Sequence, residues 1–324
     1  MSEAPGFEVE LRGVARAAQG IAAFEFARPG GRALPAFGAG AHVAVTLADG
    51  ARRWTNAYTL TGDPRDRERY RIAVLRKEAG RGGSRFLHDR VRVGDRFRLR
   101  GPASFFGIDW TARRHLLVAG GIGVTPIVAM ARELLRQGRA FEIHYAVGSL
   151  ERAAFLEELT GGMAGGRGAP ARIYASDRGE RMAIRDILSG RPLGTHLYVC
   201  GPQRLIEAAL SEARALGWPA SALHAERFAA PAGGAPFEVE LGRSGRRLAV
   251  PEDASLLEAL ERAGVAAPSL CRMGACGRCE TRVLACEGEI DHRDATLSPG
   301  DRRAARAIMP CVSRFRGRKL TLDL

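Results

Sequence analysis

The sequence predicts a multi-domain protein that joins an antiparallel β-barrel, an α/β domain with a doubly wound parallel sheet, and a small α+β domain. Three observations support this. Short alternating runs with turn signals fill the first third of the chain, and strand-like runs then alternate with helical ones. Four cysteines follow near the C-terminus in an unusual spacing. A length of 324 residues suits two or three domains.

Residues 1–104 form the predicted barrel domain. Short runs at this spacing, separated by turn residues, are typical of an antiparallel barrel or sandwich. We expect one brief helix, Ser84–Arg90, among them. The expected strands are Ile21–Ala27, Ala41–Leu47, Arg53–Leu60, Tyr70–Arg76 and Asp95–Arg100.

Residues 105–228 form the predicted α/β domain. Strand and helix alternate along this segment, which indicates βαβ units and a parallel sheet. The expected strands are His115–Ala119, Phe141–Val147, Arg172–Ala175 and His196–Cys200. The expected helices are Ile127–Arg136, Ala153–Leu159, Ile184–Leu188 and Gln203–Leu216.

Residues 229–236 (AAPAGGAP) are small, uncharged and rich in Gly and Pro, and they predict a linker. Residues 237–324 form the third predicted domain. It opens with the strands Phe237–Leu241 and Arg247–Val250 and the helix Ser255–Arg262. The cysteine-rich loop follows.

The cysteines are Cys271, Cys276, Cys279 and Cys311, in the pattern C-x4-C-x2-C followed by a distant fourth cysteine. This is the plant-type spacing of a 2Fe-2S cluster. Small residues between the first three let backbone amides approach the sulfurs. A structural zinc site is the alternative, but such sites usually carry paired C-x2-C knuckles. Cys286 is expected to be a buried thiol that binds no metal.

Gly120, Gly121 and Gly123 lie in a turn that follows a predicted strand and ends at Pro126, where a helix opens. Such a turn lets the pyrophosphate of a dinucleotide approach the backbone and the helix N-terminus. Cys200-Gly201-Pro202 ends a later strand, so it should face the same crevice. The alternatives are a glycine turn that binds nothing and a Cys200 that merely fills the core.

The loop Gly80–Ser84 offers free amides and a hydroxyl, with Arg76 and Arg81 nearby, and it predicts a cradle for a phosphate monoester. A glycine loop beside solvated arginines is the alternative. The run Asn56-Ala57-Tyr58-Thr59 adds an aromatic ring and polar groups at a strand end.

A net charge of +13 raises the possibility of nucleic-acid binding. The basic residues are nearly all Arg, scattered among acids and without interleaved aromatics, so we expect a solvated surface and no nucleic-acid partner. An acidic protein partner stays open. No secretory signal and no apolar run long enough to span a membrane are visible. We therefore expect a cytoplasmic protein in a reducing compartment. The sequence carries no signal of oligomeric state, and a monomer is the default expectation.

Read in order, these motifs resemble the phthalate dioxygenase reductase family over nearly the whole chain. The resemblance rests on GRGGS at 80–84, AGGIGVTP at 119–126, YVCGP at 198–202, GEIDHRD at 288–294 and CVS at 311–313. It implies an FMN-binding barrel, an NAD-binding domain of ferredoxin-reductase type, and a C-terminal plant-type ferredoxin of β-grasp fold.

The resemblance also implies residue roles. Tyr58 and Thr59 match a flavin-binding motif, in which Asn56 replaces the usual Arg. Thr125 would lie where nicotinamide and flavin meet, Cys200 beside the nicotinamide, and Phe228 near the flavin. The other implied cofactor-binding residues are Val74, Leu75, Arg76, Gly82, Gly83, Ser84, Gly201 and Pro202.

The implied function is the reductase component of a Rieske-type oxygenase system. NADH delivers two electrons together and a 2Fe-2S centre accepts one at a time, so a flavin belongs between them. NADPH stays possible, because Ser149 and Arg152 could accommodate a 2′-phosphate. Two alternatives are a self-contained NAD(P)H-dependent flavin, quinone or ferric reductase, and a non-enzymatic redox sensor.

Overall fold

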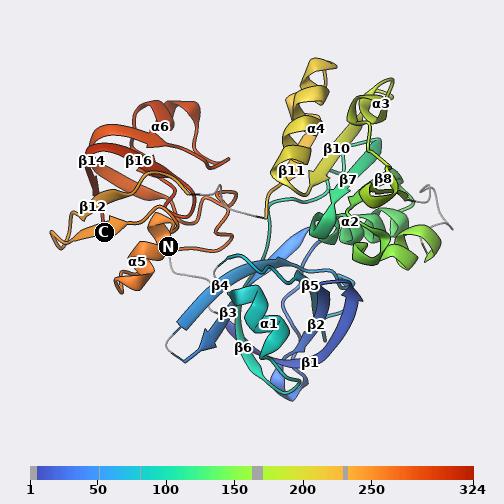
Figure 1. The fold of residues 1–324 in the computed structure, drawn as a ribbon, viewed down its shortest axis with the longest axis horizontal. Helices are drawn as coiled ribbons and strands as arrows, with labels where there is room; N and C mark the ends of the chain where they lie inside the picture. The colour runs from blue at the N-terminus through green and yellow to red at the C-terminus, as the bar shows by residue number, and fades with distance from the viewer. Residues whose placement is uncertain (1–5, 51, 81, 163–170, 229–232) are drawn as a thin grey trace. The chain divides into compact units, whose positions relative to one another are not determined.

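The computed structural model describes residues 6–50, 52–80, 82–162, 171–228 and 233–324. The described residues divide into two compact units, 6–227 and Phe228–Leu324 (Figure 1). Of the expected linker, residues 229–232 lie outside the described residues, as does Arg81 of the expected phosphate loop.

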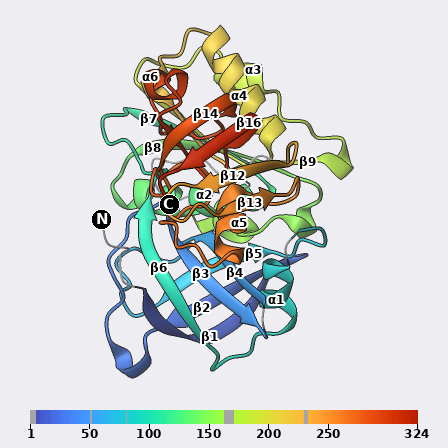
Figure 2. The same ribbon diagram turned by 90° about the vertical axis from the view of Figure 1, so that its left-hand side faces the viewer.

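The first unit begins with an antiparallel sheet of six strands in the order β4-β3-β6-β1-β2-β5. A bridge between Leu60 and Ile72 joins its two ends and closes it into the expected barrel (Figure 2). The helix α1 (Gly83–Asp89) packs beside β3 and β4. The strands are β1 (Phe7–Ala18), β2 (Ile21–Ala27), β3 (Ala41–Asp49), β4 (Arg52–Thr59), β5 (Tyr70–Leu75) and β6 (Arg96–Ser104).

The same unit continues with a five-stranded, fully parallel sheet in the order β11-β10-β7-β8-β9. Its helices are α2 (Val124–Arg136), α3 (Ile184–Leu188) and α4 (Gln203–Ala215), of which α3 and α4 lie next to each other (Figure 1). The strands are β7 (Arg114–Gly120), β8 (Ala140–Val147), β9 (Arg172–Ala175), β10 (Thr195–Cys200) and β11 (Leu223–Glu226).

The expected helix Ala153–Leu159 is wrong in its first half only, because its residues from 156 onward are helical. A 3-10 turn occupies Leu150–Arg152, and a π-helical turn occupies Glu158–Gly162. Between them Phe155 has a φ of 62°, which a right-handed helix does not allow.

The second unit holds a mixed sheet in the order β13-β12-β16-β14-β15. β12 and β16 are parallel and the other neighbours are antiparallel, and the helix α5 (Leu256–Arg262) packs near β13. This is the expected α+β arrangement. A capping box between Ser255 and Glu258 begins α5. The strands are β12 (Phe237–Leu241), β13 (Arg247–Val250), β14 (Thr281–Asp291), β15 (Ala307–Ile308) and β16 (Arg314–Leu322), and the short helix α6 is Pro299–Arg303.

Two arginines hold the start of the second unit. The buried Arg314 guanidinium donates to the carbonyls of Gly234 at 3.0 Å, Ala235 at 2.8 Å and Ala254 at 2.6 Å. Arg293 donates to Gly233 O at 2.8 Å. Hydrogen bonds from a charged donor are stronger than neutral ones, so the end of the expected linker is fixed to the sheet that follows it.

Among the described residues, no helix combines the length and apolar character needed to cross a bilayer.

Candidate cofactor sites

The four cysteines of the expected metal centre lie together in the second unit. Cys271, Cys279 and Cys311 are buried, and Cys276 is half-buried. The sulfurs form two close pairs: Cys279 Sγ lies 3.2 Å from Cys311 Sγ, and Cys271 hydrogen-bonds with Cys276. Two pairs of thiols match the needs of a two-iron centre, which takes two thiolates per iron.

One sulfur in each pair is favoured as the thiolate. A hydrogen bond from Cys271 lowers the pKa of Cys276, and a hydrogen bond with Cys311 lowers the pKa of Cys279, while the pKa values of Cys271 and Cys311 are raised. Backbone amides also point at the sulfurs, such as Met273 N at 3.4 Å from Cys271 Sγ. Because metals bind the thiolate form, this donor set fits an iron–sulfur cluster.

Glycine is required at one position of the cysteine loop. Gly274 has a φ of +72°, and a Cβ there would lie 2.7 Å from Val312 Cγ2 and 3.0 Å from Asp294 Cα. Gly277 also has a positive φ, of +67°, but a Cβ there would meet nothing nearer than Thr296 at 3.9 Å. The tight packing at Gly274 locks the loop onto the segment that carries Asp294.

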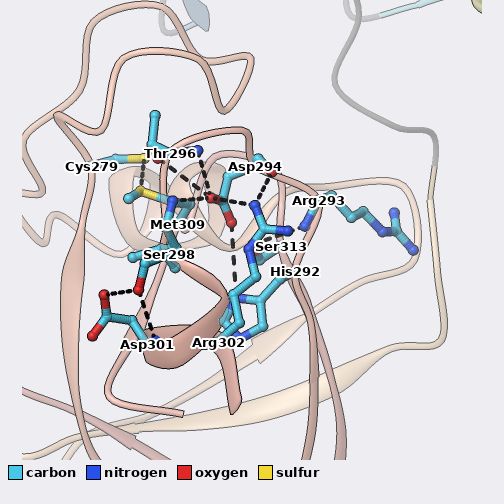
Figure 3. Close-up of polar contacts among 11 residues, drawn as sticks. Cys279, His292, Arg293, Asp294, Thr296, Ser298, Asp301, Arg302, Met309 and Ser313 are labelled. Atoms are coloured by element: carbon cyan, nitrogen blue, oxygen red, sulfur yellow. Dashed lines mark hydrogen bonds and ion pairs between the residues drawn. The ribbon is translucent and has the colours of Figure 1, made fainter. Parts of the chain in front are cut away.

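Asp294 makes several polar contacts in the segment that packs against the cysteine loop (Figure 3). Its carboxylate is buried and accepts from Leu297 N at 2.8 Å and Thr296 N at 3.0 Å, and it pairs with Arg302 at 3.3 Å. These contacts lower its pKa against the opposing effect of burial. Ala295, the residue after the GEIDHRD segment, donates from its N to Gly274 O at 2.9 Å, so the chain next to Asp294 is bonded directly to the cysteine loop.

The remaining two cysteines differ from each other. Cys200 is fully buried, as the core-filling interpretation requires, and burial raises its pKa. Cys286, expected to be buried, is half-exposed on β14, so that expectation is wrong. It lies between two register shifts of β14, which interrupt the alternation of inward and outward residues.

In the barrel, Asn56, Tyr58 and Thr59 lie on β4. Asn56 Nδ2 lies 3.0 Å from the Tyr58 hydroxyl. Thr59 is buried, and its hydroxyl has no hydrogen-bond partner within the part of the chain that the structure describes. A buried hydroxyl without a partner is costly, and a bound polar ring would satisfy it. These residues therefore fit a flavin.

The expected phosphate loop meets the same strand. Gly82 precedes α1 with a φ of +99°, and a Cβ at Gly83 would lie 2.4 Å from Asn56 Nδ2. Ser84 Oγ accepts from Lys77 N at 3.2 Å. Arg76 forms ion pairs with Glu78 and, at 3.0 Å, with Asp89, so its charge is already matched by carboxylates. Val74 is buried and Leu75 half-buried on β5.

At the carboxyl ends of β7 and β10, two glycine turns pack backbone against backbone. A Cβ at Gly123 would lie 2.3 Å from Cys200 O, and a Cβ at Gly201 would lie 2.9 Å from Gly120 Cα. A Cβ at Gly121, whose φ is +53°, would meet nothing within 4 Å. The turns therefore touch each other and leave Gly121 facing open space, as a dinucleotide crevice requires.

The other expected nucleotide residues border these turns. Thr125 is buried and donates to Ile122 O at 3.1 Å, and Pro126 is buried in the first turn of α2. Pro202 is the N-cap of α4. Ser149 is half-buried, and the exposed Arg152 donates to Gln19 Oε1 at 3.3 Å.

Sequence reasoning missed Glu226. It ends β11 directly opposite Cys200 on β10, it is almost fully buried, and one carboxylate oxygen has no partner among the described residues. Burial raises its pKa to about 8. A buried carboxyl at the carboxyl end of a strand, two residues before Phe228, is the signal that could have identified it.

Cα atoms of β5 and of the turn Gly121–Gly123 lie within 8 Å of each other. This contact joins the barrel strand with Val74 and Leu75 to the nucleotide turn. Phe228 begins the second unit, and its role near the flavin stays a prediction, as do the roles of the other site residues.

Comparison with known proteins agrees with this architecture. Residues 239–316 match the 2Fe-2S iron-sulfur cluster binding domain, and residues 102–223 match the N-terminal domain of dimethylamine monooxygenase subunit DmmA-like proteins. The chain is 47% identical to the heme-dependent oxidative N-demethylase beta subunit of Ectopseudomonas mendocina (strain ymp), over 90% of each protein. It is 39% identical to the carnitine monooxygenase reductase subunit of Escherichia coli (strain K12), over the full length of both.

Among solved structures, the chain is similar to phthalate dioxygenase reductase, described as a modular structure for electron transfer from pyridine nucleotides to 2Fe-2S. The identity is 35%, the TM-score is 0.80, and 98% of each chain is covered. Barrel, parallel-sheet domain and cluster-binding domain thus define a modular iron–sulfur oxidoreductase. The chain belongs to the phthalate dioxygenase reductase family.

Proposed function

We propose that this chain takes electrons from NADH, passes them through FMN to its own 2Fe-2S cluster, and reduces a separate terminal oxygenase. Bound flavin supplies the conversion between a two-electron donor and a one-electron acceptor. The observation that carries the proposal is the presence, on one chain, of a four-thiol loop and a glycine crevice next to a barrel strand.

At the nucleotide end, Gly121 provides room for the pyrophosphate, while Thr125 and Cys200 border the nicotinamide position. Glu226 keeps its proton at neutral pH, because its pKa is raised to about 8. A neutral carboxyl beside the fully buried Cys200 would add no charge at the end of the sheet where the nicotinamide would be held. NADPH is the second candidate donor, since Ser149 and Arg152 could face a 2′-phosphate.

At the flavin end, the buried Thr59 hydroxyl has no partner among the described residues. The Tyr58 ring, whose hydroxyl lies 3.0 Å from Asn56 Nδ2, is the proposed aromatic surface for the flavin. The amides of Gly82 and Gly83 and the Ser84 hydroxyl would hold the FMN phosphate. Asn56 occupies the usual Arg position and lies against Gly83, so it supports the loop sterically and contributes no charge.

For the cluster, Cys271, Cys276, Cys279 and Cys311 are the proposed ligands. We further propose domains at 1–104, 105–228 and 237–324 with a linker at 229–236, and a monomeric, cytoplasmic protein. The end of the barrel strand β6 at Ser104 and the division of the chain after Arg227 support these boundaries.

The terminal oxygenase is proposed to be of the Rieske type, with acidic groups on the surface that meets this Arg-rich chain. The 47% identity to a subunit of a heme-dependent oxidative N-demethylase favours a heme-type partner as the second candidate. Reduction of each type of oxygenase by the purified chain under anaerobic conditions distinguishes the two, because their visible spectra differ.

The proposal is tested with Cys276→Ser and with Cys286→Ser as the matched control, since Cys286 lies outside the proposed ligand set. Cys276→Ser should abolish NADH-dependent cytochrome c reduction but leave bleaching of the flavin by NADH intact, whereas Cys286→Ser should retain both. Undiminished cytochrome c reduction by Cys276→Ser would remove the cluster from the path and favour a self-contained reductase. Faster bleaching by NADPH would overturn the choice of NADH.

A further inference from the structure

Three side chains of types that commonly bind metals lie close together in the parallel-sheet domain, outside the cysteine loop. His196 Nδ1 lies 3.1 Å from His224 Nε2 and 3.6 Å from Asp109 Oδ2. The ligand atoms of all three residues lie within 4.8 Å of one another. None of the three residues belongs to the proposed flavin, nucleotide or cluster sites.

The fold brings the three residues together from distant parts of the sequence. His196 lies near the beginning of β10, and His224 lies on the neighbouring edge strand β11. Asp109 lies in the connection between the barrel strand β6 and the first parallel strand β7. Cys200, at the crevice, is four residues further along β10 than His196, which is about 13 Å in a strand.

The spacing suits one tetrahedral metal ion. Zinc binds imidazole nitrogen and carboxylate oxygen at about 2.0–2.2 Å, so neighbouring ligand atoms stand about 3.4 Å apart. The two short separations, 3.1 and 3.6 Å, bracket this value. The His196–His224 separation alone would also suit a hydrogen bond between the two rings. The nearby Asp109 carboxylate is the third ligand group that distinguishes a metal site from such a pair.

Neighbouring residues hold the ligands in orientation. Asp109 Oδ1 accepts from Thr111 N at 2.9 Å and Thr111 Oγ1 at 2.7 Å, while Oδ2 faces His196. The Tyr198 ring stacks on His224 with centroids 4.4 Å apart, and the Tyr198 hydroxyl accepts from Asp109 N at 2.8 Å. Outer contacts of this kind fix ligand geometry in metal sites.

The site is reachable from solvent. The Asp109 side chain is 32% exposed and that of His196 is 12% exposed. A metal ion could therefore enter, and a water molecule could complete its coordination at a fourth position.

We propose that Asp109, His196 and His224 bind one divalent transition-metal ion, with Zn²⁺ as the preferred metal. Imidazole nitrogen and a carboxylate suit Zn²⁺ better than Ca²⁺ or Mg²⁺, which take oxygen ligands. The bound ion ties the connection between barrel and parallel sheet to β10 and to the edge strand β11.

The test uses the flavin- and cluster-loaded protein, equilibrium dialysis against Zn²⁺ in slight excess, and measurement of zinc and iron in the same sample. We expect about one zinc ion per chain without loss of iron. His224→Gln should weaken zinc binding at least about tenfold. The matched control is His144→Gln, because His144 lies in the same sheet and pairs at 2.7 Å with the carboxylate of Glu142 without a second histidine.

Flavin and iron content show whether each variant is folded. If His224→Gln fails to fold, Asp109→Asn in the connecting loop replaces it and should show the same loss of zinc. Absence of zinc from the iron-replete wild-type protein would overturn the proposal and leave a hydrogen-bonded histidine pair. Zinc binding by folded His224→Gln or Asp109→Asn that equals wild-type binding would overturn it as well.

Discussion

Replacement of Gly274 by Ala should loosen the cysteine loop far more than the same replacement at Gly277. Both glycines have a left-handed φ, +72° and +67°, so each Ala variant loses roughly 1–2 kcal/mol from backbone strain. Only at Gly274 does the new methyl group collide with its surroundings, 2.7 Å from Val312 Cγ2 and 3.0 Å from Asp294 Cα. Overpacking of this kind costs about 1–3 kcal/mol more.

The assay is the thermal loss of visible circular dichroism from the cluster. Each kcal/mol lowers the melting midpoint of a domain of this size by about 4–8 °C. Gly274→Ala should therefore melt at least about 4 °C below Gly277→Ala. Iron and sulfide contents measured before heating show whether both variants start with a full cluster. Equal midpoints, or a lower midpoint for Gly277→Ala, would refute the packing argument and leave only backbone strain.

Further predictions concern the first unit and the domain boundary. The pKa of Glu226 is raised from about 4.5 to about 8 in the fold, so its contribution to stability is present below pH 4.5 and is lost as pH rises towards 8, at about 1.4 kcal/mol per pH unit. Glu226→Gln should remove this dependence of stability on pH. The raised pKa would be contradicted if the difference between the wild-type and variant denaturation midpoints stayed constant from pH 5 to pH 8. Gly123→Ala should impair NADH oxidation at least about tenfold by pushing the turn off Cys200 O, whereas Gly13→Ala, whose Cβ would lie 3.7 Å from Glu25, should not; equal rates would show that the turn tolerates the shift. Truncation near Ala232 should leave a soluble flavoprotein, and an insoluble product would argue against the proposed boundary.

The sequence predicted several elements to the residue, such as the strands Ile21–Ala27, Arg172–Ala175 and Phe237–Leu241. It missed the long strands β1 and β14. Both contain register shifts, between Leu11 and Gly13 in β1 and between Val283 and Ala285 in β14. A bulge changes the phase of the inward and outward alternation, so the pattern that identifies a strand is lost within it.

In the cofactor sites, residues close together in the sequence were predictable, whereas residues brought together only by strand pairing were not. The four cysteines were predictable because three of them lie in one short loop, where spacing alone carries the chemistry. Glu226 was not predictable in that way, because its significance comes from its register opposite Cys200 on a neighbouring strand. The set of Asp109, His196 and His224 likewise exists only once β10 and β11 are paired.

The hydrogen bonds from Arg293 and Arg314 to the carbonyls of residues 233–235 matter when electron-transfer domains are exchanged between related reductases. A graft that began at Phe237 would leave behind the Gly233, Gly234 and Ala235 carbonyls that these guanidinium groups bind. The buried Arg314 guanidinium and the partly buried Arg293 guanidinium would then face foreign sequence. A splice point upstream of Gly233 keeps these hydrogen bonds. The cluster-binding domain of such a chimaera should therefore be as stable as in the parent protein.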